Sequence, residues 1–226
     1  MIRREKTKIN ILKRDFSVEK IKNSFSKVAW FYDLWSRFAE EKAVNKALEM
    51  SKIKNGEKVL EVAVGTGIMF EHIVKLNPEG ENEGIDISDD MLKRAKKRLK
   101  DVNNKNYNLN EGNALNLQYQ DQYFDVLINN YMLDLFPGEK IDEVLREFNR
   151  VLKPGGRLVI TSMAFGEKWH NRIWFYIAKY FPYIITYCRP IKLKENIKLS
   201  GFELLETEEI SQNTFPSEVI KARKTK

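Results

Sequence analysis

The sequence predicts a single α/β domain built on a mainly parallel sheet, and three observations support this. Short apolar runs alternate with amphipathic stretches along most of the chain, as they do in βαβ units. The 226 residues are enough for one sizeable domain and few for two. Hydrophobic residues make up 42% of the chain, which fits a globular protein with a substantial core.

The first 163 residues carry this alternating pattern. Helices are expected where apolar residues recur every three or four positions, and strands where short apolar runs end at turn residues. The expected helices are at 18–50, from 68 to about 77, from 88 to about 100 and at 139–152. The expected strands are at 59–64, in a run that residues 84–87 close, near 106–112 and 123–130, and at 157–163.

The C-terminal part departs from the alternation. Residues 202–208 and 214–222 are strand-like and too close together for a crossover helix, so they should pair antiparallel. Before them, residues 169–187 hold eight of the 26 aromatic residues in a helix-like stretch. Lys179 and Pro182 interrupt it, so it should not span a bilayer. Such a stretch suits an apolar substrate pocket, a membrane interface or a well-packed cap over the sheet.

The composition argues against several classes of protein. No apolar run reaches the length of a membrane helix, and the basic N-terminus has no apolar stretch behind it, which argues against a secretory signal. A single cysteine, Cys188, forms no internal disulfide and suits a reducing cytoplasm. With two histidines, His72 and His170, the chain offers too few ligands for an ordinary zinc site, and no metal is expected.

The net charge of +7 is concentrated at the N-terminus. Residues 1–22 contain eight Lys or Arg and three Asp or Glu, a local charge of 8 − 3 = +5. A basic arm of this kind attracts nucleic acid, an anionic membrane or an acidic substrate, although a solvated tail has the same composition.

The central motif is Glu61-x-Ala-x-Gly65-x-Gly67, where a strand turns into a helix. Glycines at this turn let the backbone approach a ligand closely. Asp86 ends the next strand and can accept hydrogen bonds from two ribose hydroxyls. Phe70 stands where a dinucleotide site usually has a third glycine, so a nucleoside without a pyrophosphate fits better.

Five segments in this order resemble the class I S-adenosylmethionine-dependent methyltransferases: VLEVAVGTG, GIDIS followed by Met91-Leu92, GNALNL, FDVLINNYML and RVLKPGGRLVI. The resemblance covers about residues 56–163. FSKVAWFYDLWSRF and PSEVIKARK further resemble the subgroup of quinone-biosynthesis and phosphatidylethanolamine N-methyltransferases.

The family implies a single Rossmann-like domain, with helices on both faces of a seven-stranded, mainly parallel sheet whose last strand is antiparallel. Residues 1–50 would form an N-terminal helical cap and basic arm, and 51–226 the methyltransferase domain, with an aromatic substrate-cap insertion at 168–200.

The resemblance also implies a site for S-adenosyl-L-methionine. The methionine and adenosine parts would face Glu61 and the turn of Ala63, Val64, Gly65, Thr66 and Gly67. The ribose would bind Asp86, the adenine would lie among Ile87, Met91, Asn113 and Ala114, and the methionine end near backbone groups of Asn129. Tyr32 would close over the cofactor, unless it is a core aromatic of its helix.

Three of these positions depart from the family pattern. Ala63 replaces a usual glycine and Val64 a usual small residue, and both narrow the loop. Asn113 replaces a usual Asp, which keeps an acceptor for the adenine amino group but removes the charge.

Methyl transfer needs alignment of nucleophile, methyl group and sulfur, and it needs a base only when the nucleophile arrives protonated. Two residues that follow the fourth strand, Tyr131 and Asp134, are candidate catalytic groups because that strand end should face the methyl group. Each also suits an ordinary surface or core role.

The function expected is methylation of a small, lipid-like acceptor, either a phospholipid headgroup amine or a quinone precursor. A nucleic-acid methyltransferase is the alternative that the basic charge suggests, but Asn129-Asn130-Tyr131-Met132 lacks the prolines common in enzymes that methylate base amines. A soluble small-molecule methyltransferase and a cofactor-binding regulator without activity also remain open. The expected partners are a small-molecule or lipid substrate and, transiently, an anionic membrane surface, whereas the oligomeric state stays open.

Overall fold

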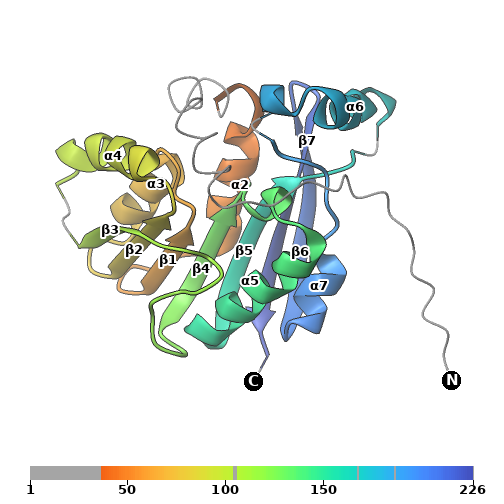
Figure 1. The fold of residues 1–226 in the computed structure, drawn as a ribbon. Helices are drawn as coiled ribbons and strands as arrows, with labels where there is room; N and C mark the ends of the chain where they lie inside the picture. The colour runs from red at the N-terminus through yellow and green to blue at the C-terminus, as the bar shows by residue number, and fades with distance from the viewer. Residues whose placement is uncertain (1–36, 104–105, 167, 186, 226) are drawn as a thin grey trace, which may run out of the picture.

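The computed structural model describes residues 37–103, 106–166, 168–185 and 187–225. Within these residues seven strands form one sheet, flanked by helices on both faces (Figure 1). The strands are β1 (Lys58–Val62), β2 (Glu81–Asp86), β3 (Tyr107–Glu111), β4 (Phe124–Asn130), β5 (Leu152–Met163), β6 (Phe202–Gln212) and β7 (Phe215–Lys224). The α-helices are α2 (Glu41–Ser51), α3 (Ile68–Leu76), α4 (Asp89–Arg98), α5 (Gly138–Val151), α6 (Arg172–Tyr180) and α7 (Lys194–Leu199). Short 3₁₀ turns are η1 (Leu99–Asp101), η2 (Leu133–Leu135), η3 (Trp169–Asn171) and η4 (Pro182–Ile185).

The strand order is β3-β2-β1-β4-β5-β7-β6. The first five strands run parallel, whereas β7 is antiparallel to both β5 and β6. Asn213 and Thr214 join β6 to β7 with φ values of 48° and 69°, the left-handed pair of a type I′ hairpin turn. The predicted sheet, including its antiparallel end, is confirmed.

Side chains alternate between two apolar layers because successive residues of a strand point to opposite faces. Val126 and Ile128 of β4 pack with α2, α3 and α4 on one face. Leu127, between them, packs with α5 and α7 on the other. The parallel strands are therefore buried on both sides, and their carboxyl ends meet at one edge of the sheet.

The helices bury one apolar stripe each. In α5 the buried residues Ile141, Val144, Leu145, Phe148 and Val151 recur every three or four positions, and each such side chain stabilises the fold by about 1.5–3 kcal/mol. Ser88 begins α4 as predicted, since its hydroxyl accepts a hydrogen bond from the Met91 backbone N–H at 3.4 Å.

Several predicted elements differ in extent, and two of them show a clear physical reason. The aromatic stretch 168–187 is divided into η3, α6 and η4, because Pro182 cannot continue a helix. β5 begins at Leu152 instead of residue 157, since Leu152 already pairs with Phe124 before a register shift.

Part of the predicted helix at 18–50 lies outside the described residues. Its C-terminal part is α2, whose Ala43, Ala47 and Met50 belong to the core beside the sheet. The division of the chain at residue 50 stays a prediction, and α2 itself packs as one of the layers that cover the sheet.

Candidate functional site

The loop between β1 and α3 lies at the carboxyl edge of the sheet. Ala63, Gly65 and Gly67 adopt φ values of 63°, 54° and 82°, so the backbone turns sharply into α3. At Gly67 an added Cβ would lie 2.9 Å from the Cβ of Ala95, which leaves no room for a side chain against α4. The loop is thus held close to α4 and bends as the glycine pattern predicts.

Asp86, at the end of β2, holds this loop. One carboxylate oxygen accepts the Gly65 N–H at 2.8 Å and the other accepts the Ser88 N–H at 2.8 Å. Burial raises the pKa of Asp86 above its usual range, and the backbone donors partly oppose that rise. A carboxylate has about four acceptor positions, so the bonds to backbone donors do not use all of them.

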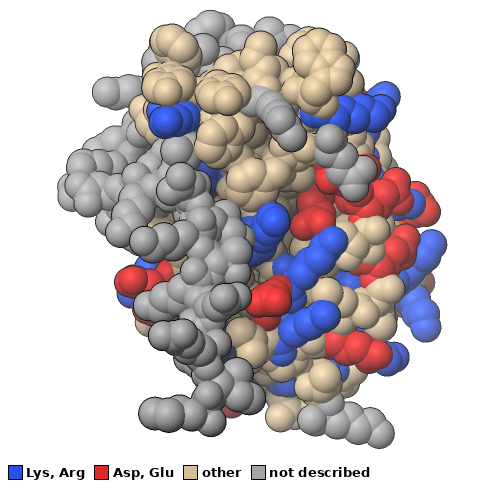
Figure 2. All heavy atoms as spheres, turned by 90° about the vertical axis from the view of Figure 1, so that its right-hand side faces the viewer, with Lys and Arg blue, Asp and Glu red and all other residues tan. Residues whose placement is uncertain are grey.

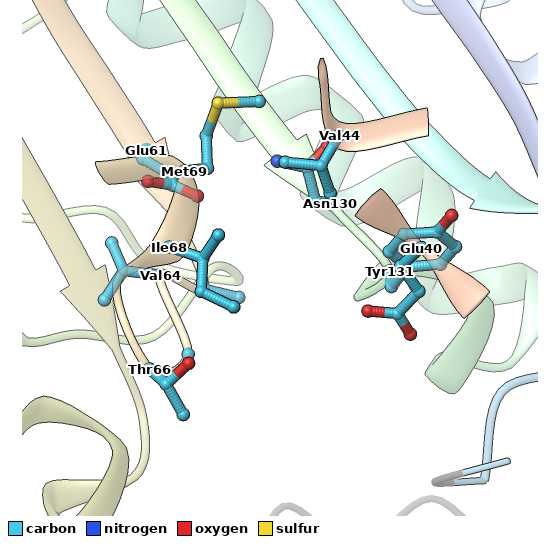
Figure 3. Close-up of a pocket in the computed structure, with 11 residues that line it drawn as sticks. Glu40, Val44, Glu61, Val64, Thr66, Ile68, Met69, Asn130 and Tyr131 are labelled. Atoms are coloured by element: carbon cyan, nitrogen blue, oxygen red, sulfur yellow. The ribbon is translucent and has the colours of Figure 1, made fainter. Parts of the chain in front are cut away.

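A pocket opens between this loop, α2 and the end of β4 (Figure 3). Glu61, Thr66 and Ile68 lie on one side of it, and Asn130, Tyr131 and Glu40 lie across from them. Its lining consists of Glu40, Val44, Glu61, Ala63, Val64, Gly65, Thr66, Ile68, Met69, Asn130 and Tyr131. None of these eleven residues is cationic.

Glu61 is a buried acid at this pocket, with 2% of its surface exposed. Its Oε2 atom has no hydrogen-bond partner, and neither side-chain polar atom of the nearby Asn130 has one within bonding geometry. Burial raises the pKa of the Glu61 carboxyl well above its usual range, the Asn130 amide partly offsets this, and the charge of Asp86 adds to it. A buried carboxylate without a partner destabilises the protein, so a cation bound in the pocket would be stabilising.

S-adenosyl-L-methionine, which the sequence resemblance implies, is such a cation. It carries an ammonium and a sulfonium group, and a positive charge beside Glu61 would satisfy the lone Oε2 atom. Its ribose hydroxyls would meet the remaining acceptor positions of Asp86. The residues present therefore fit this cofactor.

Tyr131 and Glu40 form the other side of the pocket. The Tyr131 hydroxyl lies 2.6 Å from the Ser217 hydroxyl, and its backbone has a φ of 49° just after β4. Burial and the charge of Glu40 raise the pKa of Tyr131 well above its usual value. The phenol therefore stays protonated at neutral pH, and it can donate a hydrogen bond but not act as a base.

Asp134, the second predicted catalytic group, lies outside the pocket lining. It is fully buried in η2, and its Oδ2 atom accepts the Met163 N–H at 3.1 Å. Burial raises the pKa of Asp134 to about 6, and the Met163 N–H and the charge of Arg189 oppose the rise. These contacts join η2 to β5, which favours a structural role.

The structure brings most of the predicted loop residues together. Those that line the pocket are Glu61, Ala63, Val64, Gly65, Thr66 and Tyr131, with Gly67 and Asp86 directly behind them. Tyr32 lies outside the described residues.

The residues predicted for the adenine lie beyond the pocket lining. Ile87 and Met91 follow β2, and Asn113 and Ala114 follow β3 at the same edge of the sheet. Met91 and Ala114 are buried, whereas Asn113 is exposed and accepts the Leu115 N–H at 3.0 Å. Their roles toward the adenine stay predictions.

Asn129, which was predicted to offer backbone groups to the methionine end of the cofactor, lies at the end of β4, and that backbone role stays a prediction. Its side chain is fully buried and donates a 2.9 Å hydrogen bond to the Val62 carbonyl, while the next residue, Asn130, lines the pocket. The alternation of β4 could have identified Asn130, because neighbouring residues of a strand face opposite sides.

The other lining residues that the sequence did not indicate are Glu40, Val44, Ile68 and Met69. Ile68 and Met69 begin α3 directly after the glycine loop, so the motif itself points to them. Glu40 and Val44 carry no such signal, since α2 reaches the site only through the packing of the core.

Comparison with known proteins gives a consistent result. A family model described as a methyltransferase domain matches residues 53–209. The chain is 30% identical over 205 residues to the demethylmenaquinone methyltransferase of Thermotoga maritima, a match that covers 80% of this chain and 86% of that one.

Two further matches cover a smaller share of the matched protein than the Thermotoga match does. The demethylmenaquinone methyltransferase of Listeria welshimeri is 34% identical over 148 residues, 62% of this chain and 61% of the Listeria enzyme, so the match leaves more than a third of that relative unpaired. The structure of Haemonchus contortus phosphoethanolamine N-methyltransferase 2 with S-adenosyl-L-methionine is 17% identical and has a TM-score of 0.62, over 80% of this chain and 53% of that one. At that identity the likeness concerns the fold.

Proposed function

Because the chain belongs to the methyltransferase domain family, in the class that uses S-adenosyl-L-methionine, we propose that it methylates a quinone precursor. The observation that carries the acceptor class is the pocket lining. It pairs the buried, partnerless carboxylate of Glu61 with a far side that includes the apolar Val44 and the aromatic Tyr131. That surface suits a flat, uncharged ring beside a cationic cofactor.

The cofactor supplies an electrophilic methyl group on a sulfonium, which leaves as a neutral thioether. The protein's part is to hold the reacting atoms in line and keep water out. Glu61 and the loop that Asp86 anchors would fix the cofactor. Tyr131 and Val44 would hold the acceptor ring across from it.

The acceptor of such a reaction gives up a proton. A quinol becomes a better carbon nucleophile when its hydroxyl is deprotonated, so a base near the ring helps. Glu40 is 1% exposed, lines the pocket and lies beside Tyr131, whose pKa it raises. We assign the proton to the Glu40 carboxylate, while the neutral Tyr131 hydroxyl would orient the acceptor.

A phospholipid headgroup amine is the second candidate, and the position of the Glu40 carboxylate in the pocket lining favours it. A carboxylate across from the cofactor would attract a cationic amine. Against this acceptor, none of the described lining residues is a cation that could neutralise its phosphate. The same lack of cations disfavours a nucleic acid, whose phosphates dominate its binding to proteins.

Methyl transfer from labelled cofactor tests the proposal. The full chain would be supplied with a reduced naphthoquinol bearing a short side chain, with phosphatidylethanolamine in detergent, or with total RNA. We expect label in the quinol. Label in phosphatidylethanolamine instead would establish the second candidate, and label in RNA would refute both.

Glu40→Gln refines the test. It should lower kcat for the quinol while leaving cofactor affinity unchanged, because Glu40 lies on the acceptor side. Glu41→Gln, one residue away and exposed, is the matched control. Equal rates for the two variants would remove Glu40 from the mechanism.

A further inference from the structure

Six of the ten large apolar side chains that are exposed in the described part of the chain fall in residues 169–187, on and around α6. Trp169 is 82% exposed, Tyr180 61%, and Ile173 and Tyr176 56% each. They follow each other at intervals of four, three and four residues, so they form one stripe along the outer face of η3 and α6. Phe181, 50% exposed, continues it. Figure 2 shows a group of tan side chains at the top of the molecule, where Figure 1 places α6, with blue side chains at its margin.

The opposite face of α6 is firmly packed. Trp174 and Ala178 are buried in the core. The Trp174 indole N–H donates a 3.0 Å hydrogen bond to the Thr214 hydroxyl, and its ring meets the Phe215 ring at 5.3 Å. The helix is therefore held in one orientation, with its second apolar face outward. A helix apolar on both faces needs a second apolar environment.

The charged residues of the segment that carries this stripe have one sign. Between Glu167 and Glu195 the sequence contains no Asp or Glu but six Lys or Arg. Lys168 and Lys179 are exposed within the stripe's own segment, and the Lys179 ammonium lies 5.0 Å from the centre of the Tyr180 ring. Exposed aromatics flanked by lysines are typical of helices that lie in the interface of an anionic membrane.

The stripe lies beside the candidate site. Trp174, on the inner face of α6, contacts Phe215, and the Phe215 ring lies 6.2 Å from that of Tyr131, which lines the pocket. α6 also follows β5, so it stands at the carboxyl edge of the sheet where the pocket opens (Figure 1). Anything that binds to the stripe would therefore lie close to the acceptor side of the pocket.

We propose that the stripe of Trp169, Ile173, Tyr176, Tyr180 and Phe181 docks the protein on the surface of an anionic bilayer. The contact is peripheral: α6 has nine residues, and no helix within the described part of the chain is both long and apolar enough to cross a membrane. The aromatic rings enter the headgroup region, and Lys168 and Lys179 face the lipid phosphates. Docking goes beyond the proposed reaction and does not depend on which acceptor is methylated.

Co-sedimentation of the full chain with vesicles tests this. The vesicles would contain phosphatidylcholine alone or phosphatidylcholine mixed with phosphatidylglycerol, at low and high salt. We expect binding to the mixed vesicles that weakens with salt, little binding to the neutral ones, and a blue shift of tryptophan emission on binding. Absence of binding to the anionic vesicles would overturn the proposal.

A double variant, Ile173→Glu with Tyr180→Glu, tests the stripe itself. Both side chains are more than half exposed, so the fold should tolerate the change. Binding to anionic vesicles should fall at least about tenfold, since two apolar anchors are lost and two repelling charges are added. Leu199→Glu is the matched control, because Leu199 is 86% exposed but lies on α7, near the start of β6 at the other edge of the sheet. It should bind like the unchanged protein, and equal losses in both would overturn the proposal.

Two further readouts separate this inference from its rivals. Light scattering measures the oligomeric state, and a dimer that the double variant dissociates would assign the stripe to a second copy of the chain instead. Cofactor affinity and methylation of the short-chain quinol in solution should be unchanged in the double variant. If neither the unchanged protein nor the variants bind the cofactor or methylate the quinol, but vesicle binding is intact, the proposed reaction is refuted and the proposed docking is not.

Discussion

The Gly65 backbone N–H donates a 2.8 Å hydrogen bond to the Asp86 carboxylate, so the end of β2 fixes the loop that begins α3. The same carboxylate is the predicted partner of the cofactor ribose. Because one side chain has both tasks, its loss should affect loop geometry and ligand contact together.

Asp86→Ala should therefore weaken cofactor binding strongly. Loss of hydrogen bonds to a charged group costs about 1.5–3 kcal/mol, which corresponds to roughly a 10- to 150-fold rise in Kd. Titration calorimetry with S-adenosylhomocysteine measures it. Asp90→Ala, an exposed acid four residues on, is the control and should bind normally. An unchanged Kd for Asp86→Ala would show that the nucleoside lies elsewhere.

Glu61→Gln should separate stability from affinity. The folded state raises the pKa of Glu61 above its unfolded value, so the ionised carboxylate lowers stability at neutral pH and the protonated one does not. The variant should then be more stable than the unchanged protein at pH 8 without cofactor, and the gain should vanish at acidic pH.

The same variant should bind the cofactor less tightly, because the amide cannot neutralise a cation. We expect a loss of about 1.5–3 kcal/mol. Denaturant unfolding at two pH values and calorimetry give the two readouts. A variant that loses stability at pH 8 and keeps its affinity would place Glu61 among purely structural residues.

The sequence predicted those parts of the site that are encoded locally. Gly65 and Gly67 are required by a backbone turn of positive φ, and Asp86 follows at the end of the neighbouring strand, so spacing alone locates them. Glu40 contributes to the pocket only because α2 packs on the sheet next to β4, and nothing in its own neighbourhood indicates that contact. Asn130 was within reach of the sequence, since a shift of one residue along a strand changes the face.

The same distinction applies to the fold. The antiparallel pairing of β6 and β7 followed from the short connection between two strand-like runs. The exposure of the stripe on α6 could not be predicted from the sequence, because aromatic residues at helical spacing have the same pattern whether they face the core or the surface. Only the burial of Trp174 and Ala178 on the opposite side decides which face remains outside.

Ala63→Gly should stabilise the protein. Ala63 has a φ of 63°, and the left-handed region costs a residue with a Cβ about 1–2 kcal/mol. Glycine removes that cost but loses about 0.5–1 kcal/mol through the freedom of the unfolded chain, which leaves a net gain of up to about 1.5 kcal/mol. Denaturant unfolding measures it.

Gly67→Ala is the opposing control for that comparison. Its φ is 82°, and the added Cβ would lie 2.9 Å from the Ala95 Cβ, so this variant should be less stable than the unchanged protein. If Ala63→Gly also lowers the free energy of unfolding, the backbone at residue 63 does not carry the strain assigned to it.

Asp134→Asn should change how stability depends on pH. Folding raises the pKa of Asp134 from 3.8 to about 6, so between these values the folded protein binds more protons than the unfolded chain. Stability linked to this group is therefore greatest below about pH 4 and falls as the pH rises through 6. The rise in pKa corresponds to about 3 kcal/mol. Asn does not ionise, so the difference in unfolding free energy between the unchanged protein and Asp134→Asn should shift by up to that amount between pH 4 and pH 7.

Denaturant unfolding of both proteins at several pH values gives this difference, and the contributions of Glu61 and Asp86 cancel because both proteins carry them. Asp90→Asn, which replaces an exposed acid of α4, is the control for a change of one carboxylate. The measurement also decides the role of Asp134. Because its carboxylate contacts the Met163 backbone and lies outside the pocket lining, methyl transfer by Asp134→Asn should follow the fraction of folded protein. A folded variant at pH 7 with no activity would instead make Asp134 part of the reaction.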